Sequence, residues 1–212
     1  MQAIPIEYVS FESRHHRTEF IARRYPQYLT ESVLDVGCYE APLREILKNT
    51  DYVGIDIAGN PDHVIDLEAT KRLPFDDGQF QCVLCVEVLE HLDGLHRVFE
   101  ELVRVSKCYV IVSLPNCWCS ARRQIERGRG VISHYGLPSE RPEDRHKWFI
   151  NMSQALKFFE AKATDQLQIL DLCIAEKPRN VLARYFRGLL YNKESYCNRY
   201  AHTLFAVYKK VI

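Results

Sequence analysis

The sequence predicts an α/β protein with a doubly wound, mostly parallel seven-stranded sheet. Short apolar segments alternate with segments of helical periodicity over residues 30–115, a pattern typical of βαβ units whose sheet has helices on both faces. The length of 212 residues suits one domain. The hydrophobic fraction of 47% and the charged fraction of 26% exclude a disordered or repeat-dominated chain.

The charge balance and the cysteines narrow the class of protein. Lys and Arg together number 28, as do Asp and Glu together. Binding of nucleic acid through an extended basic surface is therefore not expected. No run of about 18 apolar residues marks a membrane span, and residues 1–7 lack the features of a secretory signal. Several of the eight cysteines lie in apolar runs, so we expect reduced thiols and a cytoplasmic location.

The expected elements of the first half follow in order. Residues 1–30 form a helical lead-in, in which Ser13 caps a helix that ends before Pro26. A helix beginning at Pro42 and an amphipathic helix over 95–103 separate short apolar strands. The five expected strands lie at residues 32–37, 52–56, 63–66, 80–86 and 109–114.

The second half departs from this rhythm at residues 116–150. That stretch is rich in Arg, Gly, Pro and aromatic residues and has weak periodicity. Loops of this length in a compact domain are usually functional or mobile. A helix near 152–159, a strand near 167–174, a helix near 181–190 and a final strand near 202–211 complete a single domain over residues 1–212.

Three residues at strand ends indicate a ligand crevice, because open α/β sheets bind ligands where the strand order reverses. Gly37 ends the first strand, and Asp56 follows it by 19 residues, a spacing suited to ribose hydroxyls. Asp66 ends the third strand and is placed to contact a purine amine. The turn Gly37-Cys-Tyr-Glu-Ala lacks the second glycine that seats a pyrophosphate, so a ligand with ribose and adenine but no phosphate fits better.

Four segments in order resemble the motifs of class I S-adenosylmethionine-dependent methyltransferases. They are Val-Leu-Asp-Val-Gly-Cys (33–38), Val-Gly-Ile-Asp (53–56), Leu-Pro-Phe-Asp-Asp-Gly-Gln-Phe (73–80) and Val-Glu-Val-Leu-Glu-His-Leu (86–92). The closest likeness is to the subgroup with E-V-L-E-H after the fourth strand. The resemblance implies a Rossmann-like methyltransferase fold with strand order 3-2-1-4-5-7-6, the seventh strand antiparallel, and S-adenosylmethionine as cofactor.

The resemblance also implies roles for individual residues. Asp35 and Gly37 would frame the methionine portion of the cofactor, and Asp56 would bind the ribose. The residues implied at adenine and near the sulfonium are Asp66, Leu67 and Glu87. The chain departs from the D-x-G-x-G-x-G pattern at Tyr39 and Ala41, and a longer segment after the third strand leaves Asp66 and Glu68 as alternatives at adenine.

The candidate catalytic residues lie on the acceptor side. The insertion at 116–150 leaves the crevice side of the sheet and contains His146, which we expect to act as general base or to orient the acceptor. His91 is the competing candidate. Trp148 and Phe149 could stack on a sugar ring or simply pack the next helix. An arginine cluster could bind an anionic acceptor or form a solvated helix face: Arg122, Arg123, Arg127 and Arg129.

The cysteine and histidine spacing predicts neither a metal nor a disulfide. Cys82 and Cys85 lie three apart on a strand and so point to opposite faces. The grouping of Cys117, Cys119, His134 and His146 matches no common zinc pattern.

The predicted function is S-adenosylmethionine-dependent methyl transfer to a small-molecule or glycan hydroxyl. The alternatives are a non-catalytic cofactor-binding module that recruits a partner, and an RNA or quinone methyltransferase. The oligomeric state stays open.

Overall fold

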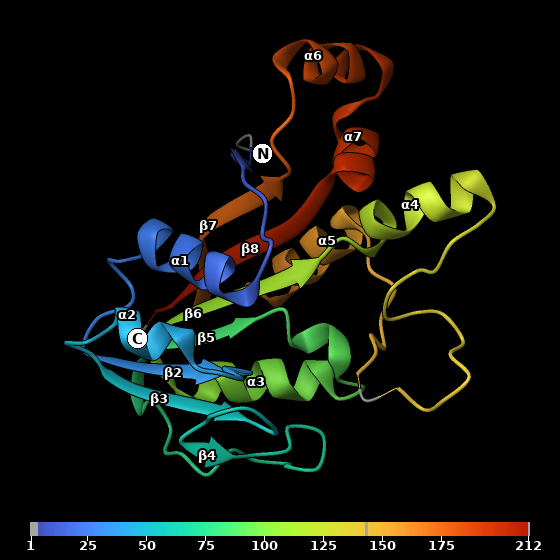
Figure 1. Ribbon diagram of the computed structural model, residues 1–212. Coiled ribbons are helices and arrows are strands. Elements are labelled where there is room, and N and C mark those ends of the chain that lie inside the picture. Colours follow the sequence, from blue (N-terminus) through green and yellow to red (C-terminus); the bar gives the residue numbers. More distant parts are fainter. Residues whose placement is uncertain (1–3, 143, 212) are drawn as a thin grey trace.

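The computed structural model describes residues 4–142 and 144–211, which form one eight-stranded sheet of order β1-β7-β8-β6-β5-β2-β3-β4 (Figure 1). Only β8 is antiparallel to its neighbours among the described strands. The strands are β1 (Ile6–Tyr8), β2 (Ser32–Val36), β3 (Asp51–Asp56), β4 (His63–Val64), β5 (Phe80–Val86), β6 (Ser106–Pro115), β7 (Leu167–Glu176) and β8 (Ala201–Lys210). The seven expected strands are present in the order that the resemblance implies.

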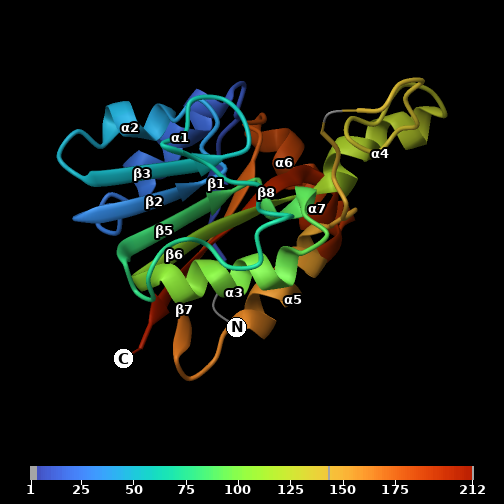
Figure 2. The ribbon, with the colours of Figure 1, turned by 90° about the horizontal axis from the view of Figure 1, so that it is seen from below.

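Helices cover both faces of the sheet, α1 and α2 on one and α3 and α5 on the other (Figure 2). The helices are α1 (Arg14–Arg24), α2 (Pro42–Ile46), α3 (Leu95–Val105), α4 (Cys117–Arg127), α5 (Met152–Lys162), α6 (Val181–Leu190) and α7 (Lys193–Tyr200), with a 3₁₀ turn at Leu89–His91. As expected, Ser13 caps α1 by accepting from the amide of His16 (3.2 Å), which satisfies a free amide of the first turn.

The core has two parts because successive strand residues point to opposite faces. Cys82 packs with Phe20 and Tyr25 of the α1 side. Cys85 packs with Leu102 of α3 and Phe159 of α5. The two cysteines therefore belong to different sides of the sheet, as the strand periodicity predicts.

The lead-in is not entirely helical, so that prediction is wrong at β1. Residues 6–8 pair in parallel with β7 at the sheet edge, and the amide of Ile174 donates to the carbonyl of Pro5 (3.0 Å). This pairing satisfies backbone groups that an edge strand would otherwise leave open.

The stretch at 116–150, where the sequence predicts weak periodicity and a solvated helix face as one alternative for the arginine cluster, begins with the helix α4. Asn116 caps this helix by accepting from the amide of Cys119 (3.3 Å), and Gly128 ends it with φ +63°. Only Cys117 and Ala121 of α4 are buried, so its apolar periodicity is weak. The short helix α7 was not predicted, and Cys197 is its one buried residue.

The topology brings the carboxyl ends of several strands to one edge of the sheet. β2, β3, β5, β6 and β7 run in the same direction, so their carboxyl ends share an edge. The connections after β6 and β7, which contain α4, α6 and α7, rise from this edge (Figure 1). No helix among the described residues is long and apolar enough to cross a membrane.

Candidate active site

The turn after β2 keeps the backbone of a glycine-rich loop although two glycines are missing. Gly37 has φ +80°, and a Cβ there would overlap Cγ2 of Val88. Tyr39 and Ala41 adopt φ +48° and +51°, a left-handed conformation that costs about 1 kcal/mol or more for a residue with a side chain. The turn thus passes close to the segment after β5.

Asp35 lies beside this turn and is 8% exposed. The hydroxyl of Tyr52 donates to its Oδ2 (2.8 Å), and burial raises the pKa of Asp35 to about 6 because water is displaced from the charged form. A cavity of about 320 Å³ adjoins it and is lined by Asp35, Gly37, Tyr39 and residues of α1 such as Arg17. Tyr52 is not among the site residues that the sequence predicts. Its place opposite Val33 in the neighbouring strand becomes evident only in the structure.

Asp56 organises the same turn from the end of β3. Its Oδ2 accepts from the amide of Tyr39 (2.8 Å) and its Oδ1 accepts from the amide of Ile57 (2.6 Å). Oδ1 also accepts from the amide of Ala58 (3.2 Å), so three of the carboxylate's roughly four acceptor sites are engaged and about one is left for a ligand hydroxyl. Asp56 therefore fixes the loop next to Gly37 as well as presenting an acceptor there.

The adenine candidates have local partners. Oδ1 of Asp66 accepts from the amide of Glu68 (2.8 Å), and the side chain of Leu67 is buried in the core. The carboxylate of Glu68 accepts from the amide of Asp93 (2.9 Å), before α3. Asp66 is engaged as well, because its Oδ1 also accepts from the amide of Ala69 (3.2 Å), so the choice between Asp66 and Glu68 at adenine stays open.

Two acidic residues follow β5. Glu87 has φ +56°, and its Oε1 accepts from the hydroxyl of Ser113 on β6 (3.1 Å). Burial raises the pKa of Glu87 and raises that of Glu90 well above its usual range. Glu90 is 0% exposed, although its position among apolar residues gave it an ordinary appearance in the sequence.

The structure brings the two candidate histidines together. The ring centroids of His91 and His146 lie 4.6 Å apart, because the insertion folds back and the amide of Lys147 donates to the carbonyl of Glu90 (2.8 Å). Nδ1 of His91 lies 2.6 Å from Oδ1 of Asp144. Burial lowers the pKa of His91 and lowers that of His146 to about 4, so both rings are neutral near pH 7.

The family of the chain is shown by its similarity to a known domain. A family model described as a methyltransferase domain matches residues 13–161. The chain belongs to the methyltransferase domain family. The predicted fold, methyltransferase activity and S-adenosylmethionine cofactor are thereby confirmed. A search of curated proteins gives no match.

Solved structures share the fold of this methyltransferase at low sequence identity. An S-adenosylmethionine-dependent methyltransferase from Archaeoglobus fulgidus aligns with a TM-score of 0.58 and 20% identity, over 94% of this chain and 96% of that one. The [4+2]-cyclase SpnF aligns with a TM-score of 0.57 and 16% identity, over 99% and 89%. The small RNA methyltransferase HEN1 aligns with a TM-score of 0.60 and 16% identity, over 97% of this chain and 26% of that one.

The residues of this methyltransferase fit its cofactor. The cavity beside Asp35 reaches Gly37, where the positive φ and the contact with Val88 require a glycine in the turn. The buried carboxylate of Asp35 complements a cationic amine, and Asp56 complements hydroxyl groups. The assignments of single residues to parts of the cofactor stay predictions.

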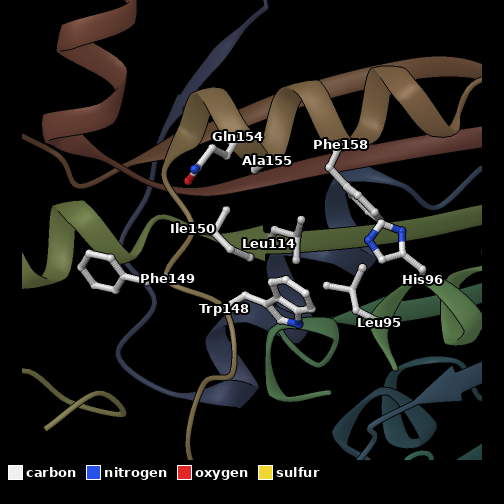
Figure 3. A pocket seen from close by; sticks show the side chains of 9 residues that line it. All are labelled: Leu95, His96, Leu114, Trp148, Phe149, Ile150, Gln154, Ala155 and Phe158. Atoms are coloured by element: carbon white, nitrogen blue, oxygen red, sulfur yellow. The ribbon is translucent and has the colours of Figure 1, made fainter. Parts of the chain in front are cut away.

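Trp148 and Phe149 of the methyltransferase differ from each other in their contacts. The indole N–H of Trp148 donates to the carbonyl of Leu92 (2.7 Å), and its ring lines an apolar cavity of about 230 Å³ between α3 and α5 (Figure 3). Phe149 points away from Trp148 in Figure 3 and packs edge-on against Tyr135, with ring centroids 4.7 Å apart. Both residues therefore anchor the end of the insertion.

Proposed function

We propose that this methyltransferase transfers the methyl group of S-adenosylmethionine to a hydroxyl of a small molecule or glycan. The observation that carries the proposal is the pair formed by His91 and His146, next to the Glu87–Glu90 segment that packs on the Gly37 turn through Val88. A hydroxyl acceptor must lose a proton, and a positioned neutral imidazole can accept one.

Each predicted site residue is given one role in this proposal. Asp35 and Gly37 hold the methionine portion, Asp56 binds the ribose, and Asp66 with Leu67 faces adenine. Glu87 lies near the sulfonium. His146 accepts the proton of the acceptor or orients it, with His91 beside it. The cofactor supplies a methyl group on a cationic sulfur, and the chain supplies alignment of the acceptor for in-line displacement.

A basic cavity favours an acceptor that carries an anionic group, such as a phosphorylated or nucleotide-linked molecule. This cavity of about 200 Å³ lies between α4 and the segment around α6 and α7. Its basic lining residues are Arg122, Arg123, Lys177, Arg179, Arg187 and Arg199. Of the arginine cluster in the sequence, Arg122 and Arg123 line this cavity and Arg127 and Arg129 do not, and one acidic residue, Glu176, lines it too. Guanidinium groups bind phosphate in bidentate fashion, which supports an anionic group of the acceptor beside Arg122 and Arg123. The eight free thiols support a reducing compartment such as the cytoplasm.

The runner-up acceptor is RNA, because the fold is shared with the small RNA methyltransferase HEN1. The net charge of zero weighs against an extended RNA surface. The other alternative is a module that binds the cofactor without catalysis.

The test is calorimetric titration with S-adenosylmethionine, followed by a methyl-release assay over four acceptor classes. These are nucleotide-linked sugars, free sugars, a quinol and short RNA, each paired with its O-methylated form as the matched control. We expect turnover on a sugar hydroxyl and none on the blocked form. Cofactor binding with no turnover on any acceptor supports the module, and turnover on RNA or quinol alone supports those alternatives.

A further inference from the structure

We propose that Glu90, His91 and His146 form a site for a divalent first-row transition-metal ion. One donor atom from each residue lies within 4.8 Å of the others. This inference departs from the sequence-based expectation of no metal, and it deepens the function proposed above because the same histidines face the acceptor.

The carboxylate of Glu90 is the first reason. The residue is fully buried, and neither Oε1 nor Oε2 has a hydrogen-bond partner among the described residues. An unpaired buried carboxylate is expensive unless a cation or a proton compensates it. Nε2 of His91 is 3.8 Å from Oε1, too long for a hydrogen bond and compatible with a shared ion between the two atoms.

The orientation of the two imidazoles is the second reason. Nδ1 of His91 is 2.6 Å from the carboxylate of Asp144, although the two are not aligned as a hydrogen bond, and Nε2 is the nitrogen nearer Glu90. A histidine that ligates a metal commonly has a carboxylate beside its other ring nitrogen.

Tyr135 lies beside the ring of His146. Its hydroxyl is 2.8 Å from Nδ1 of His146, 2.8 Å from the carbonyl of Trp148 and 2.6 Å from Sγ of Cys117. When the hydroxyl donates to the carbonyl or to the thiol, its oxygen can accept from Nδ1–H of His146, and Nε2 is then available as a ligand.

The donor set indicates the class of metal. Two imidazoles and one carboxylate suit Mn²⁺, Fe²⁺, Co²⁺ or Zn²⁺ better than Mg²⁺ or Ca²⁺, which prefer all-oxygen ligands. Three protein ligands leave open coordination positions. If the proposed function holds, an acceptor hydroxyl bound at an open position loses its proton more readily. The ion then replaces His146 as the group that activates the hydroxyl, because a metal-bound imidazole has no free lone pair to accept a proton, and Asp144 and Tyr135 act as positioning residues.

Metal binding can be tested without any acceptor or cofactor. Protein dialysed against a chelator is titrated with Mn²⁺ at pH 7.5, and free Mn²⁺ is followed by electron paramagnetic resonance. We expect one bound ion and at least a tenfold loss of affinity in Glu90→Gln, His91→Ala and His146→Ala. Asp144→Asn should weaken binding about 10–100-fold, as outer partners of ligands do. His96→Ala, a histidine of α3 outside the group, is the matched control and should bind like the wild type.

Two readouts keep the result separate from folding and from the proposed reaction. Mn²⁺ should raise the thermal midpoint of the wild type but not of Glu90→Gln, since a ligand that binds only the native state stabilises it. Absence of stoichiometric binding, or equal binding by Glu90→Gln and wild type, overturns the proposal and means that Glu90 is a protonated buried acid. Methyl transfer that proceeds in chelated protein would leave the proposed function intact while removing the metal from it.

We infer independently that α6 docks on an anionic lipid surface. The apolar side chains of this helix face outward, each 61–74% exposed: Val181, Leu182, Tyr185, Phe186, Leu189 and Leu190. The charged side turns inward, with the guanidinium of Arg184 3.8 Å above the Tyr8 ring and that of Arg187 4.3 Å above the Tyr200 ring. This orientation is the reverse of that in an ordinary surface helix.

The charge around α6 selects the occupant. Residues 177–193 contain five basic residues and no acidic one, and the basic cavity described above adjoins the helix. An apolar stripe flanked by Lys and Arg is typical of helices that lie in the headgroup region of anionic membranes. Because α6 rises from the edge that carries the site (Figure 1), docking would turn the site toward acceptors at that surface.

The test uses flotation with vesicles of phosphatidylcholine containing about 30% phosphatidylglycerol, whose negative surface attracts basic residues, and with pure phosphatidylcholine. We expect binding to the anionic vesicles only, weakened at high salt, and at least a tenfold loss in Phe186→Ser/Leu190→Ser. Val64→Ser on β4, also 74% exposed in the wild type, is the matched control. Failure to bind anionic vesicles overturns the proposal. A doubled mass in light scattering, lost in the double variant, would assign the face to a second copy instead.

Discussion

The hydroxyl of Tyr52 donates a 2.8 Å hydrogen bond to the carboxylate of Asp35 across two adjacent parallel strands. This bond favours the charged form of Asp35, but burial opposes it more strongly, so the pKa stays raised at about 6. Asp35 therefore holds a charge that destabilises the cofactor-free protein and that a cationic ligand group would compensate.

The first prediction is a pH dependence of stability that belongs to Asp35. Its pKa rises from 3.8 to about 6 in the folded chain, so the native state binds more protons than the unfolded state between these values. The free energy of unfolding should fall by up to about 3 kcal/mol as pH rises from 4 to 7. Asp35→Asn should lose this component, which urea denaturation at several pH values measures.

The same variant separates stability from binding. Asp35→Asn should be more stable than the wild type at pH 7 without cofactor, yet bind S-adenosylmethionine at least tenfold more weakly because a charged partner is lost. Equal pH profiles for the two proteins would contradict the assignment.

The second prediction concerns Asp56. Asp56→Ala should weaken S-adenosylmethionine binding by about 1.5–3 kcal/mol, measured by calorimetry, because both the ribose acceptor and the anchor of the Tyr39 amide are removed. Asp76→Ala, at an exposed turn carboxylate, serves as the control. Unchanged affinity in Asp56→Ala would remove Asp56 from the cofactor site.

The third prediction compares two glycines with positive φ. Gly37→Ala should destabilise the fold by roughly 2–4 kcal/mol, from left-handed backbone strain together with overlap on Val88. Gly128→Ala has φ +63° but no atom within 4 Å of the new Cβ, so it should cost only about 1 kcal/mol. Urea denaturation measures both, and similar losses would show that Val88 yields easily.

The sequence was most informative where burial was greatest. Strands such as β5 are buried on both faces, so they appear as short apolar runs that can be placed within a few residues. The three residues of β1 carry no such run and form a strand only because the edge of β7 is available. The sequence offers the helix α4 only as one alternative for the arginine cluster, because few of its side chains are buried.

The site residues also differ in how well the sequence predicts them, because some are placed by local pattern and others by long-range contacts. Residues that end strands, such as Gly37 and Asp56, lie where the topology alone predicts. The contact between His91 and Asp144 joins residues far apart in sequence and depends on how the insertion folds back, which no local pattern encodes. Glu90 lies between the buried residues Leu89 and Leu92, with half-buried His91 beside it, and as a polar residue near the start of a helix it gave no signal of its burial.

The last prediction concerns the histidine pair. His146→Ala should lower turnover about 10²–10⁴-fold, the usual contribution of a positioned group that handles a proton, whereas its S-adenosylmethionine affinity should stay within about twofold. The reason is geometric: His146 contacts Tyr135 and His91 on the acceptor side, and it is not among the residues that line the cavity beside Asp35.

Steady-state kinetics with calorimetry on His146→Ala, His91→Ala and the control His96→Ala separates the possibilities. Loss in His91→Ala alone assigns the proton to the 3₁₀ turn and leaves the insertion only the selection of the acceptor. Loss in both single variants, with the double variant no worse than either, indicates that the two rings act as one unit. Full turnover in both would mean that alignment alone carries the methyl transfer.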